Sequence, residues 1–175
     1  RHVYQPGLLF VPFGLAHVDE IVRPRRRQLR GDVVFHENEI ETVWIDRDEV
    51  LLDDGTVLPY DALVVASGVD LQTSETEGLT GPGWNERVFT FYTPDGASAL
   101  HAALERFDGG RLVVNFVDMP IKCPVAPLEF AFLADWYLRE RGIRGRTELV
   151  YATPLDGAFT KPIASEHLAG VLAEK

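Results

Sequence analysis

The chain has 175 residues, of which 46% are hydrophobic and 25% are charged, and its formal net charge is −10 at pH 7. This is the composition of an ordinary globular protein, and the length allows one or two hydrophobic cores. The acidic charge argues against nucleic acid as the main partner, because phosphate repels an acidic surface. The single cysteine excludes an intrachain disulfide, and no apolar run reaches the roughly 18 residues of a membrane-spanning helix.

The first third of the chain is predicted to be irregular and then β-structured. Residues 4–13 are apolar but carry two prolines, which favours an irregular buried segment or a short helix. The arginine-rich residues 23–30 are typical of a solvated basic turn. β-branched side chains predict a strand at 32–36. Alternating residues and an Asp-Gly turn signal predict a small antiparallel meander over residues 39–58.

A further strand signal follows the meander directly. Residues 63–65 are a continuous apolar run, which is typical of a strand buried on both faces of a sheet. Ala66, Ser67 and Gly68 are small residues at its carboxyl end, where they would let a ligand or another backbone approach closely. Tight packing of strand against loop explains these small residues equally well. The following residues, 70–87, predict a loop and a domain boundary.

The second half of the chain alternates helices with strands. The predicted helices are residues 94–107, 128–141 and 164–174, and the predicted strands are residues 111–117 and 147–152. Pro127 at the start of the middle helix and Gly142 after its end fit the usual placement of these residues. Strands that alternate with helices indicate a parallel sheet, so the predicted fold class is α/β.

The loop between the strand at 111–117 and the helix at 128–141 contains the only cysteine, Cys123. A dinucleotide-binding unit would carry a glycine-rich phosphate turn here, but residues 119–127 hold a lysine, a cysteine and three prolines and no glycine. The pattern favours thiol chemistry over pyrophosphate binding. The reactive form is the thiolate, which Lys122 and the N-terminus of the following helix would stabilise. The alternative is a buried, inert cysteine.

Other candidate side chains predict structure rather than chemistry. The five histidines are scattered without metal-ligand spacing, so no metal site is predicted. The helix after the cysteine loop carries an aromatic stripe of Phe130, Phe132, Trp136 and Tyr137, which is expected to be core rather than a ligand site. Asp135 in the same run is expected to face solvent.

Several of these segments together resemble one family. Residues 60–68 (YDALVVASG) resemble the YDxLVxATG signature of flavin-dependent disulfide-reductase-like oxidoreductases, with Ser in place of Thr. Glu39 and Ile40, before a strand-turn-strand, are similar to their adenine-contacting segment, and Pro6 lies in a segment like the aromatic-x-Pro after their first FAD-binding unit. Residues 122–127 (KCPVAP) are more specific, because they resemble the segment of sulfide:quinone oxidoreductases that carries a redox-active cysteine beside the flavin.

The resemblance covers nearly the whole chain, but several family features have no counterpart in it. These are the N-terminal GxGxxG motif, a later Gly-Asp segment, a partner cysteine and a membrane-docking region. The chain is therefore expected to be an internal piece of a longer enzyme. We also expect residues 1–175 alone to bind FAD weakly or not at all, with an exposed sheet edge that leads to dimerisation or to disorder near residues 1–35.

The resemblance implies partial FAD/NAD(P)-binding, Rossmann-like domains. Residues 1–80 would be the remainder of an FAD-binding domain, including the meander and the end of the strand at 63–65. Residues 88–175 would be a second Rossmann-like subdomain that carries Cys123. The implied catalytic residues are Cys123 and Lys122, and the implied FAD-binding residues are Pro6, Glu39, Ile40, Ala66, Ser67, Gly68 and Pro124.

The implied function is oxidation of sulfide through Cys123 and FAD, with quinone as the electron acceptor. Two enzymatic alternatives stay open, an NAD(P)H-dependent FAD oxidoreductase and a flavocytochrome-type sulfide dehydrogenase. A non-catalytic binding or assembly domain that has kept the fold is an alternative of another class. The expected location is the cytoplasm or, by peripheral contact of the whole protein, a membrane surface of bacterial type.

Overall fold

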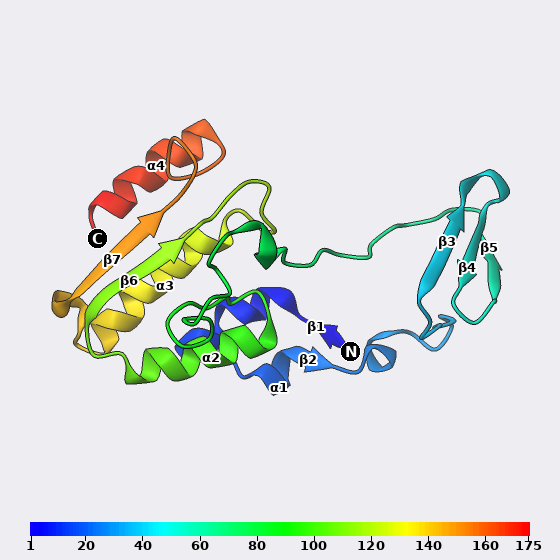
Figure 1. Cartoon of the computed structure of the whole chain (residues 1–175), viewed down its shortest axis with the longest axis horizontal. Helices are drawn as coiled ribbons and strands as arrows, with labels where there is room; N and C mark the ends of the chain where they lie inside the picture. The colour runs from blue at the N-terminus through cyan, green and yellow to red at the C-terminus, as the bar shows by residue number, and fades with distance from the viewer. The chain divides into compact units, whose positions relative to one another are not determined.

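A computed structural model describes residues 1–175, which form two compact units (Figure 1). The larger unit combines Arg1–Arg23 with Leu71–Lys175, and the meander unit is Pro24–Asp70. A parallel strand pair with helices and a separate antiparallel sheet confirm the predicted α/β class. The predicted division by function, at 1–80 and 88–175, stays a prediction, because compactness does not show which cofactor a segment binds.

The meander unit contains the antiparallel sheet predicted for residues 39–58. Its strands are β3 (Ile40–Trp44), β4 (Glu49–Leu52) and β5 (Val57–Pro59), paired in the order β3-β4-β5. The turn between β4 and β5 follows from Gly55, which adopts φ +83°, a conformation that L side chains rarely reach. The arginine-rich segment before the sheet is the short 3-10 helix η3 (Arg25–Gln28), which has no buried residue and so confirms the solvated basic turn.

Two predicted strands of the meander unit are absent, and both predictions were wrong. Residues 32–36 form a turn and an unpaired extended segment. Residues 63–65 are also unpaired, and Val64 and Val65 are 85% and 75% exposed rather than buried. The physical reason is the same for both, because a strand needs a neighbouring backbone to satisfy its N–H and C=O groups. Within residues 1–175 no strand pairs with either segment.

The start of the larger unit is irregular, as its prolines predict. Strand β1 (His2–Val3) pairs antiparallel with β2 (Val22–Arg23). Between them lie the 3-10 helices η1 (Gln5–Leu9) and η2 (Val11–Phe13) and the short helix α1 (Val18–Ile21). These helices bury apolar side chains against the rest of the unit, so the segment is part of its core.

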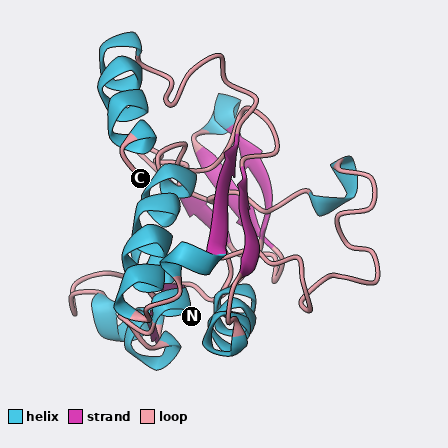
Figure 2. Ribbon diagram, turned by 90° about the vertical axis from the view of Figure 1, so that its left-hand side faces the viewer, coloured by secondary structure: helices cyan, strands magenta, loops and turns pink.

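The remainder of the larger unit confirms the predicted alternation. The elements are α2 (Pro94–Arg106), β6 (Gly110–Asn115), α3 (Ala126–Glu140), β7 (Thr147–Ala152) and α4 (Pro162–Ala173), joined by the loops drawn pink in Figure 2. Strands β6 and β7 are parallel and in register from the Gly110–Thr147 pair to the Asn115–Ala152 pair. None of the helices has both the length and the apolar character needed to cross a membrane.

The core of the larger unit lies where η2, α2, β6 and α3 meet. Its buried members are Phe13, Leu100, Leu104, Val114, Phe130, Ala131 and Ala134. The aromatic stripe of α3 contributes through Phe130, which stacks on Phe91 with ring centroids 4.9 Å apart and planes 13° apart. Trp136 of the same stripe is instead 41% exposed, so the prediction of a core stripe holds only in part.

Asp135 on α3 is buried, at 2% exposure, so the expectation that it faces solvent was wrong. Its carboxylate accepts hydrogen bonds from Arg139 Nε at 2.8 Å and Arg144 Nε at 2.6 Å, and Lys175 Nζ lies 3.6 Å away. Burial alone would raise the pKa of Asp135. The hydrogen bonds and positive charges of the two arginines outweigh this burial and hold the pKa below its ordinary value.

Candidate active site

The loop between β6 and α3 presents Cys123 to solvent. The loop begins at the carboxyl end of β6, where Phe116 is 1% exposed and its N–H donates to the Ala152 carbonyl at 2.8 Å. It ends at the first turn of α3. The carboxyl ends of parallel strands are where open α/β sheets usually bind their ligands. Cys123 is therefore exposed, so the part of the alternative that expected a buried cysteine was wrong, and its reactivity stays a prediction.

The backbone of Cys123 has an unusual conformation, with φ +56° in the left-handed region. Few residues other than glycine adopt it, and the cost is on the order of 1–3 kcal/mol. Two donors meet at its carbonyl oxygen, which accepts the Ala126 N–H at 3.0 Å and the Tyr92 hydroxyl at 3.4 Å. The loop thus holds the cysteine in a defined backbone position.

The first turn of α3 follows three residues after Cys123. The helix begins at Ala126, with Pro127 in its first turn and no side-chain cap from Val125. The N-terminus of an α-helix carries a partial positive charge, and here the first turn also contains one acidic residue, Glu129. The predicted source of thiolate stabilisation therefore lies next to the cysteine in the chain.

The two neighbours of Cys123 are Lys122 and Pro124, both partly buried. Lys122 makes no ion pair with any carboxylate in residues 1–175, so its charge is not neutralised by a partner. Pro124 lacks a backbone N–H and restricts the chain directly after the thiol. Three of the predicted site residues, consecutive in the sequence, therefore lie in this loop.

Tyr92 is a site residue that sequence analysis did not single out. It lies 31 residues before Cys123 in the chain, and no spacing rule connects the two. Burial raises the pKa of Tyr92, and negative charge at Cys123 and at Tyr151 raises it further. The phenol is therefore protonated over the ordinary pH range and acts as a hydrogen-bond donor.

The predicted FAD-binding residues of the meander unit lie in two places. Ile40 is 61% exposed at the start of β3, and Glu39 is exposed directly before it. Ala66, Ser67 and Gly68 are all exposed and lie in the extended segment after β5. In the larger unit, Pro6 is exposed in the first turn of η1, with Lys122, Cys123 and Pro124 in the loop before α3.

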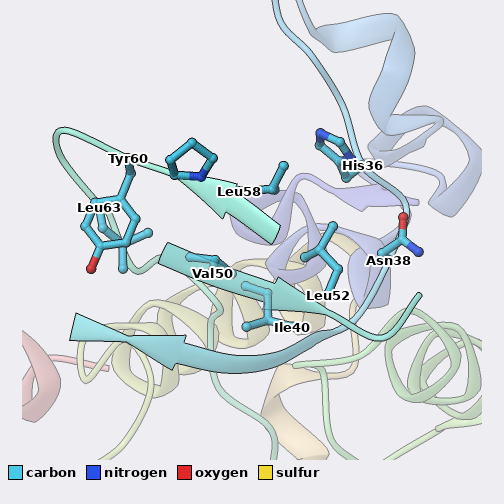
Figure 3. Close-up of a pocket in the computed structure, with 9 residues that line it drawn as sticks. His36, Asn38, Ile40, Val50, Leu52, Leu58, Tyr60 and Leu63 are labelled. Atoms are coloured by element: carbon cyan, nitrogen blue, oxygen red, sulfur yellow. The ribbon is translucent and has the colours of Figure 1, made fainter. Parts of the chain in front are cut away.

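The meander unit also has a cavity of about 390 Å³. Figure 3 shows His36 and Asn38 towards one end and Tyr60 and Leu63 towards the other, with apolar side chains of the sheet between them. The lining residues are His36, Asn38, Ile40, Val50, Leu52, Leu58, Pro59, Tyr60 and Leu63. Of the predicted cofactor-binding residues, Ile40 lines this cavity. The lining of this cavity is mainly apolar.

The chain is similar over its whole length to curated sulfide:quinone oxidoreductases, although no family model matches it. The mitochondrial enzyme of Mus musculus is 23% identical over 175 residues, which is 100% of this chain and 39% of that protein. The mitochondrial enzyme of Schizosaccharomyces pombe is 24% identical over 162 residues, which is 91% of this chain and 35% of that protein. The chain therefore spans less than half the length of these relatives.

Solved structures show the same fold. The sulfide:quinone oxidoreductase of Aquifex aeolicus matches with a TM-score of 0.72 at 21% identity, covering 98% of this chain and 40% of that one. A chain of the mitochondrial ATP synthase of Tetrahymena thermophila matches with a TM-score of 0.67 at 12% identity, covering 99% of this chain and 45% of that one. Together with the curated relatives, these matches confirm the predicted resemblance to the sulfide:quinone oxidoreductases and relate the chain to an oxidoreductase family.

Proposed function

We propose that this chain is part of a flavoprotein that oxidises sulfide through Cys123, with FAD and then quinone as electron acceptors. The observation that carries the proposal is the exposed thiol in the loop between β6 and α3, in a chain similar throughout to sulfide:quinone oxidoreductases. Quinones are apolar, so we also propose a peripheral contact of the whole protein with a membrane surface.

Two observations support the predicted FAD-binding residues. Gly68 adopts φ +82°, and a Cβ at this position would meet nothing within 4 Å, so its backbone is open to close approach. Ile40 lines the apolar cavity of the meander unit. We propose that FAD is held by Pro6, Glu39, Ile40, Ala66, Ser67, Gly68 and Pro124. When bound, FAD supplies a two-electron acceptor.

The proposed role of Cys123 is that of a sulfur nucleophile and carrier. A thiol and hydrogen sulfide that join as a persulfide form one S–S bond and release two protons and two electrons. The nucleophilic form is the thiolate, and both Lys122 and the N-terminus of α3 lie next to it in the chain. The protons pass to solvent, to which Cys123 is exposed, and quinone is the final acceptor of the electrons.

The test of the proposal is sulfide-dependent reduction of a short-chain quinone by the protein that contains residues 1–175. We expect the unaltered protein to be active and Cys123→Ser to be inactive, with an exposed control, Ser74→Ala, unchanged. Mass spectrometry of the sulfide-treated protein should show a gain of one sulfur atom at Cys123. Full activity of Cys123→Ser would contradict the proposed role of the thiol.

The two enzymatic alternatives differ in electron donor and acceptor. The loop at 119–127 has no glycine and three prolines, so it offers few N–H groups to a pyrophosphate. This favours sulfide over NAD(P)H as the donor. Flavin reduction by NADH without sulfide would favour the NAD(P)H-dependent oxidoreductase, and reduction of cytochrome but not of quinone would favour the flavocytochrome-type dehydrogenase.

A non-catalytic assembly role is the second candidate function. The observation in its favour is that a chain of the Tetrahymena thermophila mitochondrial ATP synthase shares this fold, and a shared fold does not imply a shared chemistry. A protein that carries no flavin, is inactive with sulfide and co-purifies in a stable complex would support this role. Cys123→Ser would then leave the complex intact.

A further inference from the structure

We propose that Tyr92 is a positioning residue for Cys123, because its hydroxyl holds the carbonyl of the cysteine and so fixes the backbone that carries the thiol. This inference rests on the proposed function of Cys123. It adds to that function a second residue, from a different part of the chain, that acts through the cysteine rather than on the substrate.

The contact joins two segments that are distant in sequence. The Tyr92 hydroxyl donates to the Cys123 carbonyl at 3.4 Å, across 31 residues of chain. The same carbonyl accepts the Ala126 N–H at 3.0 Å, at the first residue of α3. The cysteine carbonyl is therefore held from two directions, once by its own helix and once by a side chain from the segment before α2.

The Tyr92 ring is itself held in place. It stacks on Phe91, with ring centroids 4.7 Å apart and planes 21° apart, and Phe91 stacks in turn on Phe130 of α3. The Tyr92 N–H donates to Thr90 Oγ1 at 3.2 Å, and Thr93 caps the start of α2. The hydroxyl therefore extends from a rigid aromatic stack, and such a donor loses little conformational entropy when it binds the loop.

The conformation of Cys123 explains why an external donor is needed. A non-glycine residue at φ +56° persists only where surrounding contacts hold it. The Ala126 hydrogen bond lies within the same turn and moves with it, whereas Tyr92 connects the turn to the core. Loss of the phenol hydroxyl would release the loop from that anchor and let the cysteine leave its place beside the start of α3.

The test compares Tyr92→Phe with Tyr137→Phe in the protein that contains residues 1–175. Each variant loses one phenol hydroxyl, and Tyr137 is also partly buried and packed against Phe13, but it makes no hydrogen bond to Cys123. The readout is the rate of Cys123 alkylation by iodoacetamide from pH 6 to 10, which needs neither sulfide nor quinone. Thermal melting checks that both variants are folded.

We expect Tyr92→Phe to alkylate roughly two- to tenfold more slowly across these pH values, which is the factor for loss of one hydrogen bond. Tyr137→Phe should match the unaltered protein. A merely structural tyrosine would change the melting temperature but not these rates. If Tyr92→Phe does not fold, 4-fluorophenylalanine at position 92, which keeps the size but cannot donate, takes its place.

An unchanged profile in either variant at position 92 would overturn the inference. The result is independent of the proposed function. Slower alkylation of Tyr92→Phe in a protein without sulfide activity supports the positioning role while the proposed function fails. Sulfide activity that depends on Cys123, together with an unchanged alkylation profile in Tyr92→Phe, would support the proposed function. The same result would overturn the role of Tyr92.

Discussion

At the scale of single residues, Asp135 is a buried charge in the larger unit. Its carboxylate is buried with Arg139 and Arg144 as hydrogen-bond donors. Asp135→Asn keeps the volume and removes the charge, which leaves the cations without their partner. We expect it to lower the free energy of unfolding by about 3 kcal/mol, as for other broken buried ion pairs, measured by urea denaturation at pH 7.

The pH dependence of this effect has a definite sign. The pKa of Asp135 is lower in the folded state than in the unfolded state, so its stabilisation is complete above the unfolded pKa of about 3.9 and is lost as the pH falls through the folded pKa. The difference between the unaltered protein and Asp135→Asn should therefore shrink below about pH 4. Glu148→Gln, which removes an exposed ion pair with Arg111, is the control and should change stability by about 0.5 kcal/mol or less. A similar decrease in the free energy of unfolding for Asp135→Asn and Glu148→Gln would contradict the expectation that a buried ion pair contributes more than an exposed one.

Sequence analysis could predict Cys123 but not its partners, for a physical reason. A cysteine between a predicted strand and a predicted helix can be recognised from the sequence, because the pattern involves only neighbouring residues. The contacts of Tyr92 and of Asp135 are set by tertiary packing. A charged residue in an apolar helix predicts a solvent-facing side chain, and for Asp135 this prediction was wrong. Arg144, which neutralises Asp135, lies beyond the end of α3, outside the helical spacing that sequence reasoning uses.

At the scale of elements, two helical glycines are expected to respond to alanine substitution with stability changes of opposite sign. A Cβ on Gly96 in α2 would overlap the carbonyl oxygen of Thr90, whereas a Cβ on Gly170 in α4 would meet nothing within 4 Å. We expect Gly96→Ala to destabilise the fold by about 1–3 kcal/mol through overpacking. Gly170→Ala should stabilise it by about 0.5–1 kcal/mol, because alanine is the better helix former. Thermal melting followed by circular dichroism measures both, and the same sign for both changes would contradict the packing of α2.

Elements were predictable where the signal is local and its neighbours lie nearby in the chain. Gly55 at positive φ closes the β4–β5 turn, and Gly142, at φ +66°, follows the end of α3. The strand predicted at 63–65 failed for a different reason. Its apolar run was correctly read as suited to burial, but burial needs adjacent strands, and no pattern within the run specifies whether residues 1–175 contain them.

At the scale of the whole molecule, the chain is two compact units, and both clusters of buried apolar residues belong to the larger one. The three-stranded sheet of the meander unit buries Val50 and Leu52, while the segment that follows leaves Val64 and Val65 largely exposed. Unpaired extended backbone with apolar side chains is a template for pairing with another chain. We therefore expect the exposed segment to affect association with another chain, and not the stability of the core of the larger unit.

We therefore expect residues 1–175 expressed alone to self-associate through residues 63–65. Val64→Lys should favour the monomer, because a charged side chain on an unpaired strand opposes pairing with a second copy. The measurement is sedimentation velocity over a range of protein concentrations. The control is Ile163→Lys, which places the same charge on an apolar residue of α4 that is 88% exposed. Self-association that persists in Val64→Lys, or that is lost equally in both variants, would assign it to a different surface. Since Val64 is already 85% exposed, the substitution removes no core contact, and a change in association then reflects the segment itself.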